Sequence, residues 1–188
     1  MLRNVLNRLR ARRETAAIRD LPDRRLMADV YIPALAARGG TILWVGARAY
    51  TVQDYGALER QGAVVWTTDI DPKAARWGRH GRHRTGDLCD IDRVFPDITF
   101  DAIVCNGVFG FGVDTPEMQA RAYAAMANVL KPKGLLLLGW NTDKTSDPVA
   151  DSLPQAWFKS VDFAGVGART TFTDVTHVYD IFKREPSR

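Results

Sequence analysis

Four short apolar segments and one weaker one, separated by helical patterns, constrain the fold of this chain more than any other feature. Each segment is too short for a helix, and the apolar ones are rich in residues that favour strands. Strands that alternate with helices predict a parallel sheet, because a parallel connection needs a crossover segment. The expected strands are residues 41–45, 63–68, 82–86, 100–105 and 135–140, and the expected helices are residues 52–60, 72–78 and 115–130.

The pattern changes after Trp140. Residues 147–157 are compatible with a helix or a loop, and two further strands are expected at Phe158–Gly165 and Thr176–Lys183. No full-length helical pattern separates these two strands, so we expect them to pair antiparallel. The nearly continuous apolar character of the earlier strands predicts helices on both faces of the sheet.

The N-terminal residues carry the excess positive charge. The net charge is +4, and residues 1–38 hold nine arginines and four acidic residues, which leaves the remainder close to neutral. An apolar stripe within residues 2–9 predicts one helix, and residues 22–38 predict a second, which ends at the two glycines that follow. This basic segment is either a solvated helix face or a contact, through residues 1–20, with an anionic membrane or a partner.

Length and composition limit the class of protein. The chain has 188 residues, of which 46% are hydrophobic and 26% charged, values typical of one globular domain. The longest apolar run, Leu135–Leu138, is far shorter than a membrane span, and no secretory signal pattern precedes it. Two cysteines, Cys89 and Cys105, are too few for a disulfide framework or a zinc site. We therefore expect a cytoplasmic protein without a bound metal.

Polar or small residues follow successive expected strands, where ligands bind in open parallel sheets. Asp69 lies 23 residues after Gly46, an arrangement that suits a carboxylate accepting hydrogen bonds from ribose hydroxyls. Asp87 is placed to accept from an exocyclic amine such as that of adenine, and Asn106 lies at the middle of the crevice. The alternative for each polar residue alone is a helix cap or a turn.

Five segments of the chain carry motifs that occur together in one family. They are ILWVG at 42–46, TDIDP at 68–72, GDL at 86–88, FDAIV at 100–104 and VLKPKGLLL at 129–137. Together they resemble the motifs of class I S-adenosylmethionine-dependent methyltransferases. The resemblance implies an α/β fold, a three-layer Rossmann-like sandwich whose seven-stranded sheet is mostly parallel with an antiparallel last strand. It also implies a single methyltransferase-like domain over residues 1–188, with 1–38 as a basic helical extension and 39–188 as the core.

The resemblance further implies S-adenosyl-L-methionine as the cofactor, and a role for each strand end. The loop that starts at Gly46 would approach the methionine end, and its arginine could meet the cofactor carboxylate. The acid after the second strand would hold the ribose, and the acid after the third would bind the adenine amine. The residues expected to bind the cofactor are Gly46, Ala47, Arg48, Asp69, Ile70, Asp87, Leu88, Asn106 and Gly107.

The first loop departs from the family pattern. Trp44 stands where the family carries an acid, and Arg48 and Tyr50 stand where it carries its later glycines. Glycine permits a positive φ and a close approach of the backbone to a ligand, which Arg and Tyr do not readily allow. Either the loop takes another path and still binds the cofactor, or the site is altered.

No catalytic residue can be assigned from the sequence. Among the three histidines, His80 and His83 lie in a basic turn and are interpreted as solvated polar residues, and His177 is interpreted as a packed strand histidine. After the fourth expected strand, Asn106–Phe109 keeps only the ends of the pattern typical of amino-methylating members, so N-methylation is not specifically supported. An acceptor wall from Phe109, Phe111 and Trp140, or contacts within 140–157, are further hypotheses.

Three functions remain open. The first is a methyltransferase acting on a small-molecule or glycan acceptor. The second is a non-catalytic binding or scaffold protein whose altered loop has lost the cofactor. The third is a nucleic-acid methyltransferase that uses the basic N-terminal segment to hold phosphates, a reading that the neutral remainder of the chain does not favour. A nicotinamide-binding fold is disfavoured, because residues 46–51 do not form the glycine pattern of that class.

Overall fold

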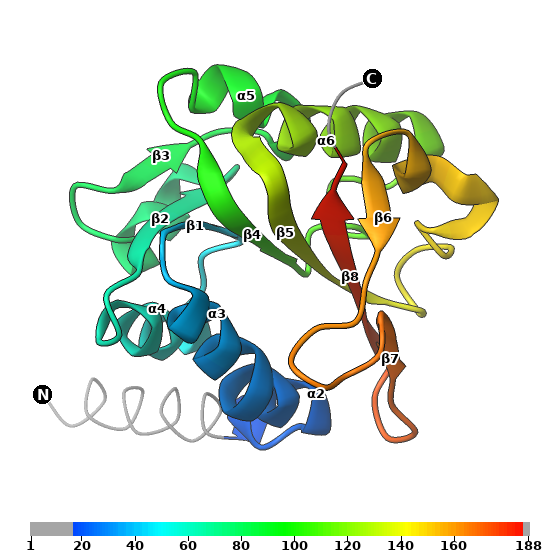
Figure 1. The fold of residues 1–188 in the computed structure, drawn as a ribbon, viewed down its shortest axis with the longest axis horizontal. Helices are drawn as coiled ribbons and strands as arrows, with labels where there is room; N and C mark the ends of the chain where they lie inside the picture. Colours follow the sequence, from blue (N-terminus) through cyan, green and yellow to red (C-terminus); the bar gives the residue numbers. More distant parts are fainter. Residues whose placement is uncertain (1–16, 186–188) are drawn as a thin grey trace, which may run out of the picture.

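A twisted β-sheet forms the centre of the structure, a computed structural model that describes residues 17–185 (Figure 1). Seven strands follow the order β3-β2-β1-β4-β5-β8-β6, and β7 pairs with β8 outside this path. The strand order reverses between β1 and β4, which makes this point the expected ligand crevice. The strands are β1 (Thr41–Val45), β2 (Val64–Asp69), β3 (His83–Thr85), β4 (Phe100–Asn106), β5 (Leu130–Asn141), β6 (Phe158–Ser160), β7 (Arg169–Thr171) and β8 (His177–Arg184).

The pairing confirms the predicted fold class. The strands β1 to β5 pair in parallel, and β8 pairs antiparallel with β5, β6 and β7. The short strand β7 has no counterpart among the expected elements, because its three residues show no apolar run. Strand β5 begins at Leu130, five residues before the expected start, and the sheet register shifts between Phe100 and Ala102 to accommodate the extra residues.

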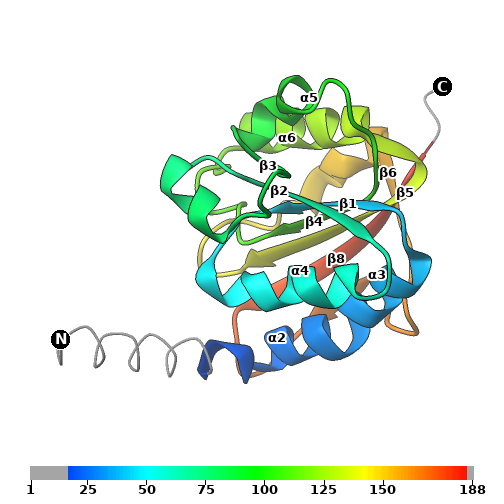
Figure 2. The ribbon, with the colours of Figure 1, turned by 90° about the vertical axis from the view of Figure 1, so that its left-hand side faces the viewer.

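Helices cover both faces of the sheet (Figure 2). One face carries α2 (Pro22–Leu26), α3 (Ile32–Arg38) and α4 (Val52–Glu59), and the other carries α5 (Ile91–Val94) and α6 (Pro116–Val129). The expected helix over residues 22–38 is present, with a π-helical turn at Met27–Tyr31 between α2 and α3. It ends at Gly39, which adopts a φ of 69° that favours glycine. Shorter 3₁₀ turns occupy Ala49–Thr51, Pro72–Trp77, Leu88–Asp90 and Ala150–Ala156.

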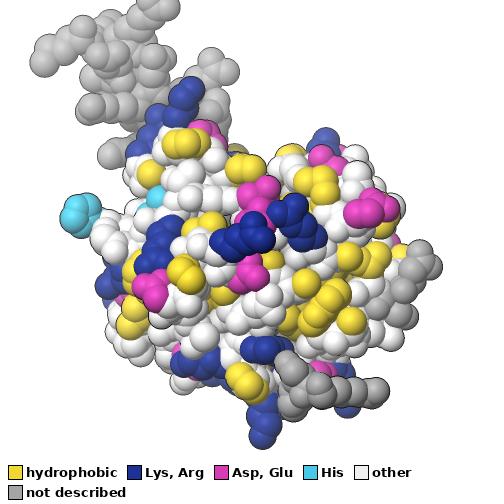
Figure 3. Space-filling view, turned by 90° about the horizontal axis from the view of Figure 1, so that it is seen from above, with side chains coloured by type: hydrophobic (Ala, Val, Ile, Leu, Met, Phe, Trp, Pro, Cys, Tyr) yellow, Lys and Arg dark blue, Asp and Glu magenta, His cyan; other side chains and the backbone are white. Residues whose placement is uncertain are grey.

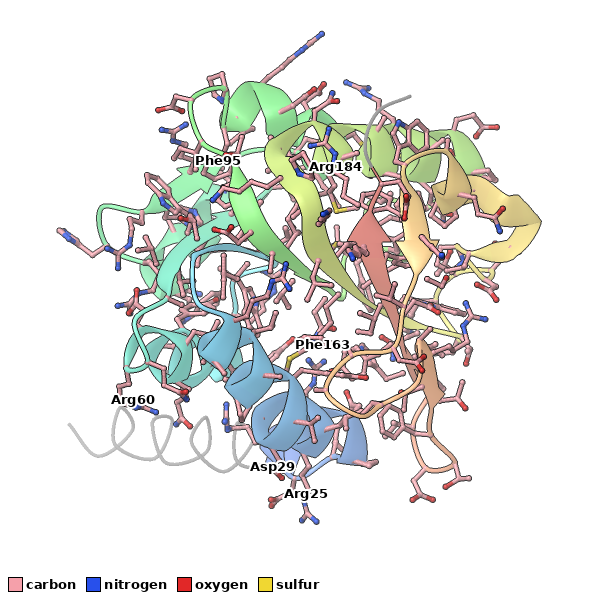
Figure 4. All side chains as sticks on the ribbon, in the orientation of Figure 1. Arg25, Asp29, Arg60, Phe95, Phe163 and Arg184 are labelled. Atoms are coloured by element: carbon pink, nitrogen blue, oxygen red, sulfur yellow. The ribbon has the colours of Figure 1, made fainter. Side chains whose placement is uncertain are left out.

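Two hydrophobic cores lie on opposite sides of the sheet. The core under α5 and α6 includes Phe95, and Phe163 packs against the core under α2, α3 and α4, as the labelled side chains of Figure 4 illustrate. Residues 22–38 belong to this second core, because Tyr31, Ile32 and Leu35 are each at most 2% exposed. Burial of a side chain of this size stabilises a fold by about 1.5–3 kcal/mol. The second half of the predicted basic extension therefore contributes to the packing of the sheet.

The predicted helix within residues 2–9 lies outside the described residues, as do most of residues 1–20, which we expected to contact a membrane or partner. In the part of the chain that the structure describes, no helix combines the length and the apolar character needed to cross a membrane.

Candidate functional site

A pocket opens at the carboxyl ends of β1, β2 and β4, at the point where the strand order reverses. It contains about 460 Å³ of empty space, part of it open to solvent. Seven of the nine residues expected to bind a cofactor line it. The lining residues are Val45, Gly46, Arg48, Asp69, Ile70, Gly86, Asp87, Leu88, Gly107, Val108, Phe111, Gly112 and Val113.

The other two expected residues lie next to the pocket. Ala47 is fully buried. Asn106 is 8% exposed and continues the row of Ala102 and Val104 along β4, so its side chain projects toward the core under α2 and α3. Its backbone carbonyl oxygen lies 3.1 Å from the point that a Cβ on Gly46, a residue that lines the pocket, would occupy.

The loop after β1 has a positive φ at its first glycine position and not at the two later positions where the family carries glycine. Gly46 has a φ of 87°, whereas Arg48 is extended with a φ of −139°, and Tyr50 does not have a positive φ either. The hydroxyl of Thr51 fixes this path, because it accepts a hydrogen bond from the Arg48 amide at 3.1 Å and donates one to the Arg48 carbonyl at 2.8 Å. The loop thus takes a path that its non-glycine residues allow.

Tyr50 points away from the pocket, toward the N-terminal segment. The guanidinium of Arg24 lies over its ring at 5.2 Å, and the Tyr50 carbonyl accepts a hydrogen bond from Arg19 at 3.1 Å. Of the two residues that replace family glycines, only Arg48 therefore faces the ligand space.

Arg48 forms an ion pair with Asp69 inside the pocket. The Asp69 side chain is 3% exposed and that of Arg48 is 45% exposed. The other carboxylate oxygen of Asp69 accepts a hydrogen bond from the Asp71 amide at 3.0 Å, which holds the carboxylate in place. We expected Arg48 to bind a cofactor carboxylate. In this structure its guanidinium is instead paired with Asp69, the carboxylate expected to hold a ribose.

The adenine end of the expected site combines a carboxylate with apolar side chains. Asp87 Oδ1 accepts a hydrogen bond from the Cys89 amide at 2.9 Å, so the residue does form a local turn, and it also lines the pocket. Ile70 and Phe111 are 64% and 56% exposed, more than any other large apolar side chain in the described part of the chain. Exposed apolar surface inside a pocket favours a ligand with a flat apolar face.

The sequence interpretation missed most of the loop that closes the pocket after β4. Val108, Gly112 and Val113 line the pocket together with Phe111, which we expected only as part of an acceptor wall. The other members of that wall, Phe109 and Trp140, are core residues at 0% and 3% exposure. The available signal was the glycine spacing, because Gly107, Gly110 and Gly112 all adopt positive φ angles.

None of the three histidines lines the pocket. His80 is exposed, and His83 bonds through Nδ1 to the Thr67 hydroxyl at 3.0 Å on the β3 side of the sheet. His177 is 2% exposed and packs under α2, as expected for a strand histidine. Burial lowers the pKa of His177 to about 3, with a further contribution from the Arg24 cation, so the imidazole is neutral.

Comparison with known proteins finds similarity to methyltransferases. The family described as "Methyltransferase domain" matches residues 49–138, slightly less than half of the chain. This range includes β2, β3, β4 and most of β5, and it begins after β1. No curated protein matches the sequence.

Solved structures extend the likeness over nearly the whole chain. N-methyltransferase NodS from Bradyrhizobium japonicum WM9, in complex with S-adenosyl-L-homocysteine, is 15% identical with a TM-score of 0.64 and covers 89% of this chain and 90% of its own. A TehB-like SAM-dependent methyltransferase from Corynebacterium glutamicum is 19% identical with a TM-score of 0.66 and covers 98% and 100%. An S-adenosylmethionine-dependent methyltransferase from Clostridium acetobutylicum is 8% identical with a TM-score of 0.68 and covers 97% and 100%.

The fold and the domain match together confirm the resemblance stated above. The chain has the class I S-adenosylmethionine-dependent methyltransferase fold, and residues 49–138 are similar to the methyltransferase domain family.

Proposed function

We propose that this protein is a methyltransferase that binds S-adenosyl-L-methionine in the pocket at the ends of β1, β2 and β4. One observation carries the proposal: two carboxylates, Asp69 and Asp87, line the same pocket as the exposed apolar side chains of Ile70 and Phe111. This set fits a ribose, an exocyclic amine and a flat base in one pocket. When bound, the cofactor supplies an electrophilic methyl group.

The residues of this chain would hold the cofactor as follows. Asp69 accepts hydrogen bonds from the ribose hydroxyls, and Asp87 accepts one from the adenine amine. The turn at Gly46 permits close approach of the backbone to the methionine end. Arg48 must leave Asp69 when the ribose binds, and its released guanidinium is then free to pair with the cofactor carboxylate.

The acceptor proposed here is a small molecule or a glycan. The face seen in Figure 3 carries acidic and basic side chains side by side. Elsewhere on the molecule, exposed arginines pair with acids, as Arg121 does with Asp90. Nucleic-acid binding requires a surface of predominantly positive charge, because it depends on contacts with many phosphates. The mixture of charges on this face supports the small acceptor over a nucleic acid. The two buried free thiols, Cys89 and Cys105, fit a reducing compartment such as the cytoplasm.

Calorimetric titration with S-adenosyl-L-homocysteine tests the ribose contact. In Asp69→Ala we expect affinity to fall at least tenfold, because a hydrogen bond to a charged group contributes about 1.5–3 kcal/mol. Asp97→Asn is the matched control, since Asp97 is an exposed acid that pairs with Arg84 outside the pocket. Equal affinity in the wild type and Asp69→Ala would reject the assignment of Asp69.

A non-catalytic scaffold is the competing function. It is favoured by one observation, the ion pair that already occupies Asp69. A folded chain that gives no heat with either S-adenosylmethionine or S-adenosylhomocysteine would support the scaffold and contradict the enzyme.

A further inference from the structure

A second pocket lies at the edge of the sheet opposite to the cofactor pocket, and we call it the distal pocket. It contains about 680 Å³ of empty space, part of it open to solvent. Its walls come from the end of α3, the first half of β5, the loop after β6 and the end of β8. The cofactor pocket lies at the carboxyl ends of parallel strands, whereas the distal pocket lies toward the amino end of β5. The two pockets share no lining residue.

Three basic side chains and one acid line the distal pocket. They are Arg38, Lys133, Lys183 and Asp162, which leaves an excess of two positive charges. Among the described residues, no ion pair includes any of the three basic side chains. Asp162 Oδ1 accepts a hydrogen bond from the Ala168 amide at 3.0 Å, which ties the carboxylate to its own loop. The contacts of the described residues therefore leave this positive charge available to a ligand.

Arg38 and Lys133 are held together on one side of the distal pocket. Arg38 Nη2 donates a hydrogen bond to the Lys133 carbonyl at 3.1 Å, and the guanidinium has further N–H groups to offer. Lys131 Nζ already pairs with the nearby carboxylate of Asp101 at 2.9 Å. Lys133 has a φ of 64°, in the left-handed region that favours glycine. Backbone strain of this kind occurs often at ligand sites, where it positions a side chain.

Lys183 lies opposite another lysine on the far side of the distal pocket. In the antiparallel pairing of β6 with β8, the partner of Lys183 is Lys159, and its partner on β5 is Leu135. Like charges that lie directly opposite each other destabilise a pair of strands. A bound anion would relieve this repulsion, so the pairing favours an anionic ligand beside Lys183.

The rest of the lining is apolar. Leu135 is 6% exposed, and Val161 and Phe163 are half-buried and pack against the core under α2, α3 and α4. The Phe163 ring, labelled in Figure 4, stacks on Tyr31 with the ring centroids 6.4 Å apart, which holds it in place. Apolar walls combined with a few charged groups suit a ligand that has an apolar body and a charged head.

The charge excess selects among anionic heads. A phosphate monoester has a second pKa of about 6, so it carries close to two negative charges at neutral pH, and it offers three acceptor oxygens. A carboxylate carries only one charge. Arginine binds phosphate through paired N–H groups and lysine binds it as a point charge, and the distal pocket presents both.

We propose that the distal pocket binds a small organic phosphate monoester. Its phosphate would lie among the three basic side chains and its apolar part against the three apolar ones. This ligand is not the methyl acceptor, because it binds at the opposite edge of the sheet from the cofactor pocket. The proposal therefore stands apart from the proposed methyl transfer and can be tested without a cofactor.

Methyl NMR of the full chain tests the proposal with phenyl phosphate as the probe. Leu135 and Val161 report on the distal pocket, and Val45 and Leu88 report on the cofactor pocket. We expect phenyl phosphate to shift the first pair in a saturable manner, and more weakly as NaCl is added, because salt screens exposed charges. Phenol lacks the charge and inorganic phosphate lacks the apolar body, so each should bind about fivefold more weakly or worse.

Charge variants localise the binding. Lys183→Met should weaken phenyl phosphate about fivefold, and the double variant Lys133→Met/Lys183→Met about tenfold or more, because each removes a charged partner. Lys183→Arg keeps the charge and should keep the affinity. Lys73→Met is the matched control, since Lys73 is exposed, lines neither pocket and loses the same charge.

Four results would overturn the proposal. They are no shift of Leu135 and Val161 at millimolar phenyl phosphate, an equal response to phenol, an equal response to inorganic phosphate, and an equal loss of affinity in Lys73→Met. Vesicles that contain phosphatidic acid provide a further arm, and they should not sediment the chain. Sedimentation that is lost in the double variant would assign the distal pocket to a membrane surface and overturn the small-molecule ligand.

Discussion

The ion pair between Arg48 and Asp69 sets the first condition for ligand binding, since the carboxylate expected to hold ribose already holds a guanidinium. The Arg48 side chain is 45% exposed, so water screens the pair and its net stabilisation is about 0–1 kcal/mol. A ligand that offers two ribose hydroxyls and a carboxylate replaces this contact on both sides. The arginine that breaks the family pattern is therefore compatible with cofactor binding.

Arg48→Ala should change the affinity of two ligands in opposite directions. Adenosine, which has no carboxylate, should bind up to about fivefold more tightly because Asp69 is free. S-adenosylhomocysteine should bind about tenfold more weakly because its carboxylate loses a charged partner. Titration calorimetry measures both, with Arg93→Ala as a control at an exposed arginine outside the pocket. A change of the same sign for both ligands would reject the proposed exchange of partners.

The buried neutral His177 should make stability fall at acidic pH. Its pKa is about 3 in the fold and ordinarily 6.5, so between these values the unfolded chain binds the extra proton. The stability from the neutral ring is complete above pH 6.5 and is lost as the pH falls, by about 2 kcal/mol between pH 6.5 and pH 5. Burial raises the pKa of Asp23, which acts in the opposite sense below its folded pKa.

Urea unfolding at pH 5 and pH 7 measures this effect. His177→Phe should show a smaller loss of stability on acidification than the wild type, while His80→Gln should match the wild type. Identical pH dependence in His177→Phe and the wild type would show that His177 does not titrate between the folded and unfolded states.

The sequence indicated which residues lie at the strand ends and could not indicate how they pair. Asp69, Asp87 and Gly46 were predictable because each directly follows a strand. The contact between Arg48 and Asp69 depends on a rotamer across 21 positions of the chain, and no local pattern specifies it. The burial of the Asn106 and His177 side chains depends on the register of the sheet, which only the folded chain reveals.

At the scale of elements, helices and strands with strong periodicity were predictable, and short ones were not. The helix α6 follows its predicted cap, and β4 lies within one residue of its expected bounds. The four-residue α5 and the three-residue β7 carry no period, so tertiary contacts alone define them. The loop over residues 107–114, which closes the pocket, was likewise visible only as a series of glycines.

Thr115→Ala should weaken the start of α6, the helix that follows this loop. The Thr115 hydroxyl accepts a hydrogen bond from the Met118 amide at 3.3 Å, and loss of such a cap costs about 1 kcal/mol. Urea unfolding measures the cost, and Thr115→Ser should recover most of the stability because it retains the hydroxyl. A Thr115→Ala variant as stable as the wild type would show that the cap does not stabilise the fold.

At the scale of the whole molecule, one sheet separates two cores, and a pocket opens at the point where its strand order reverses. The helices α2 and α3 complete the second core on one face of the sheet. Part of the positively charged N-terminal segment, residues 22–38, thus also packs against the sheet. The division at residue 38 into extension and core stays a prediction.

Binding of the cofactor product is the measurement that tests the central claim most directly. Titration of the full, folded chain with S-adenosyl-L-homocysteine should give saturable binding at one site, and the ligand should raise the melting temperature as its concentration increases. Asp69→Ala should lose both effects while keeping its fold. A folded wild-type chain that gives neither heat nor a thermal shift at millimolar ligand would contradict the account.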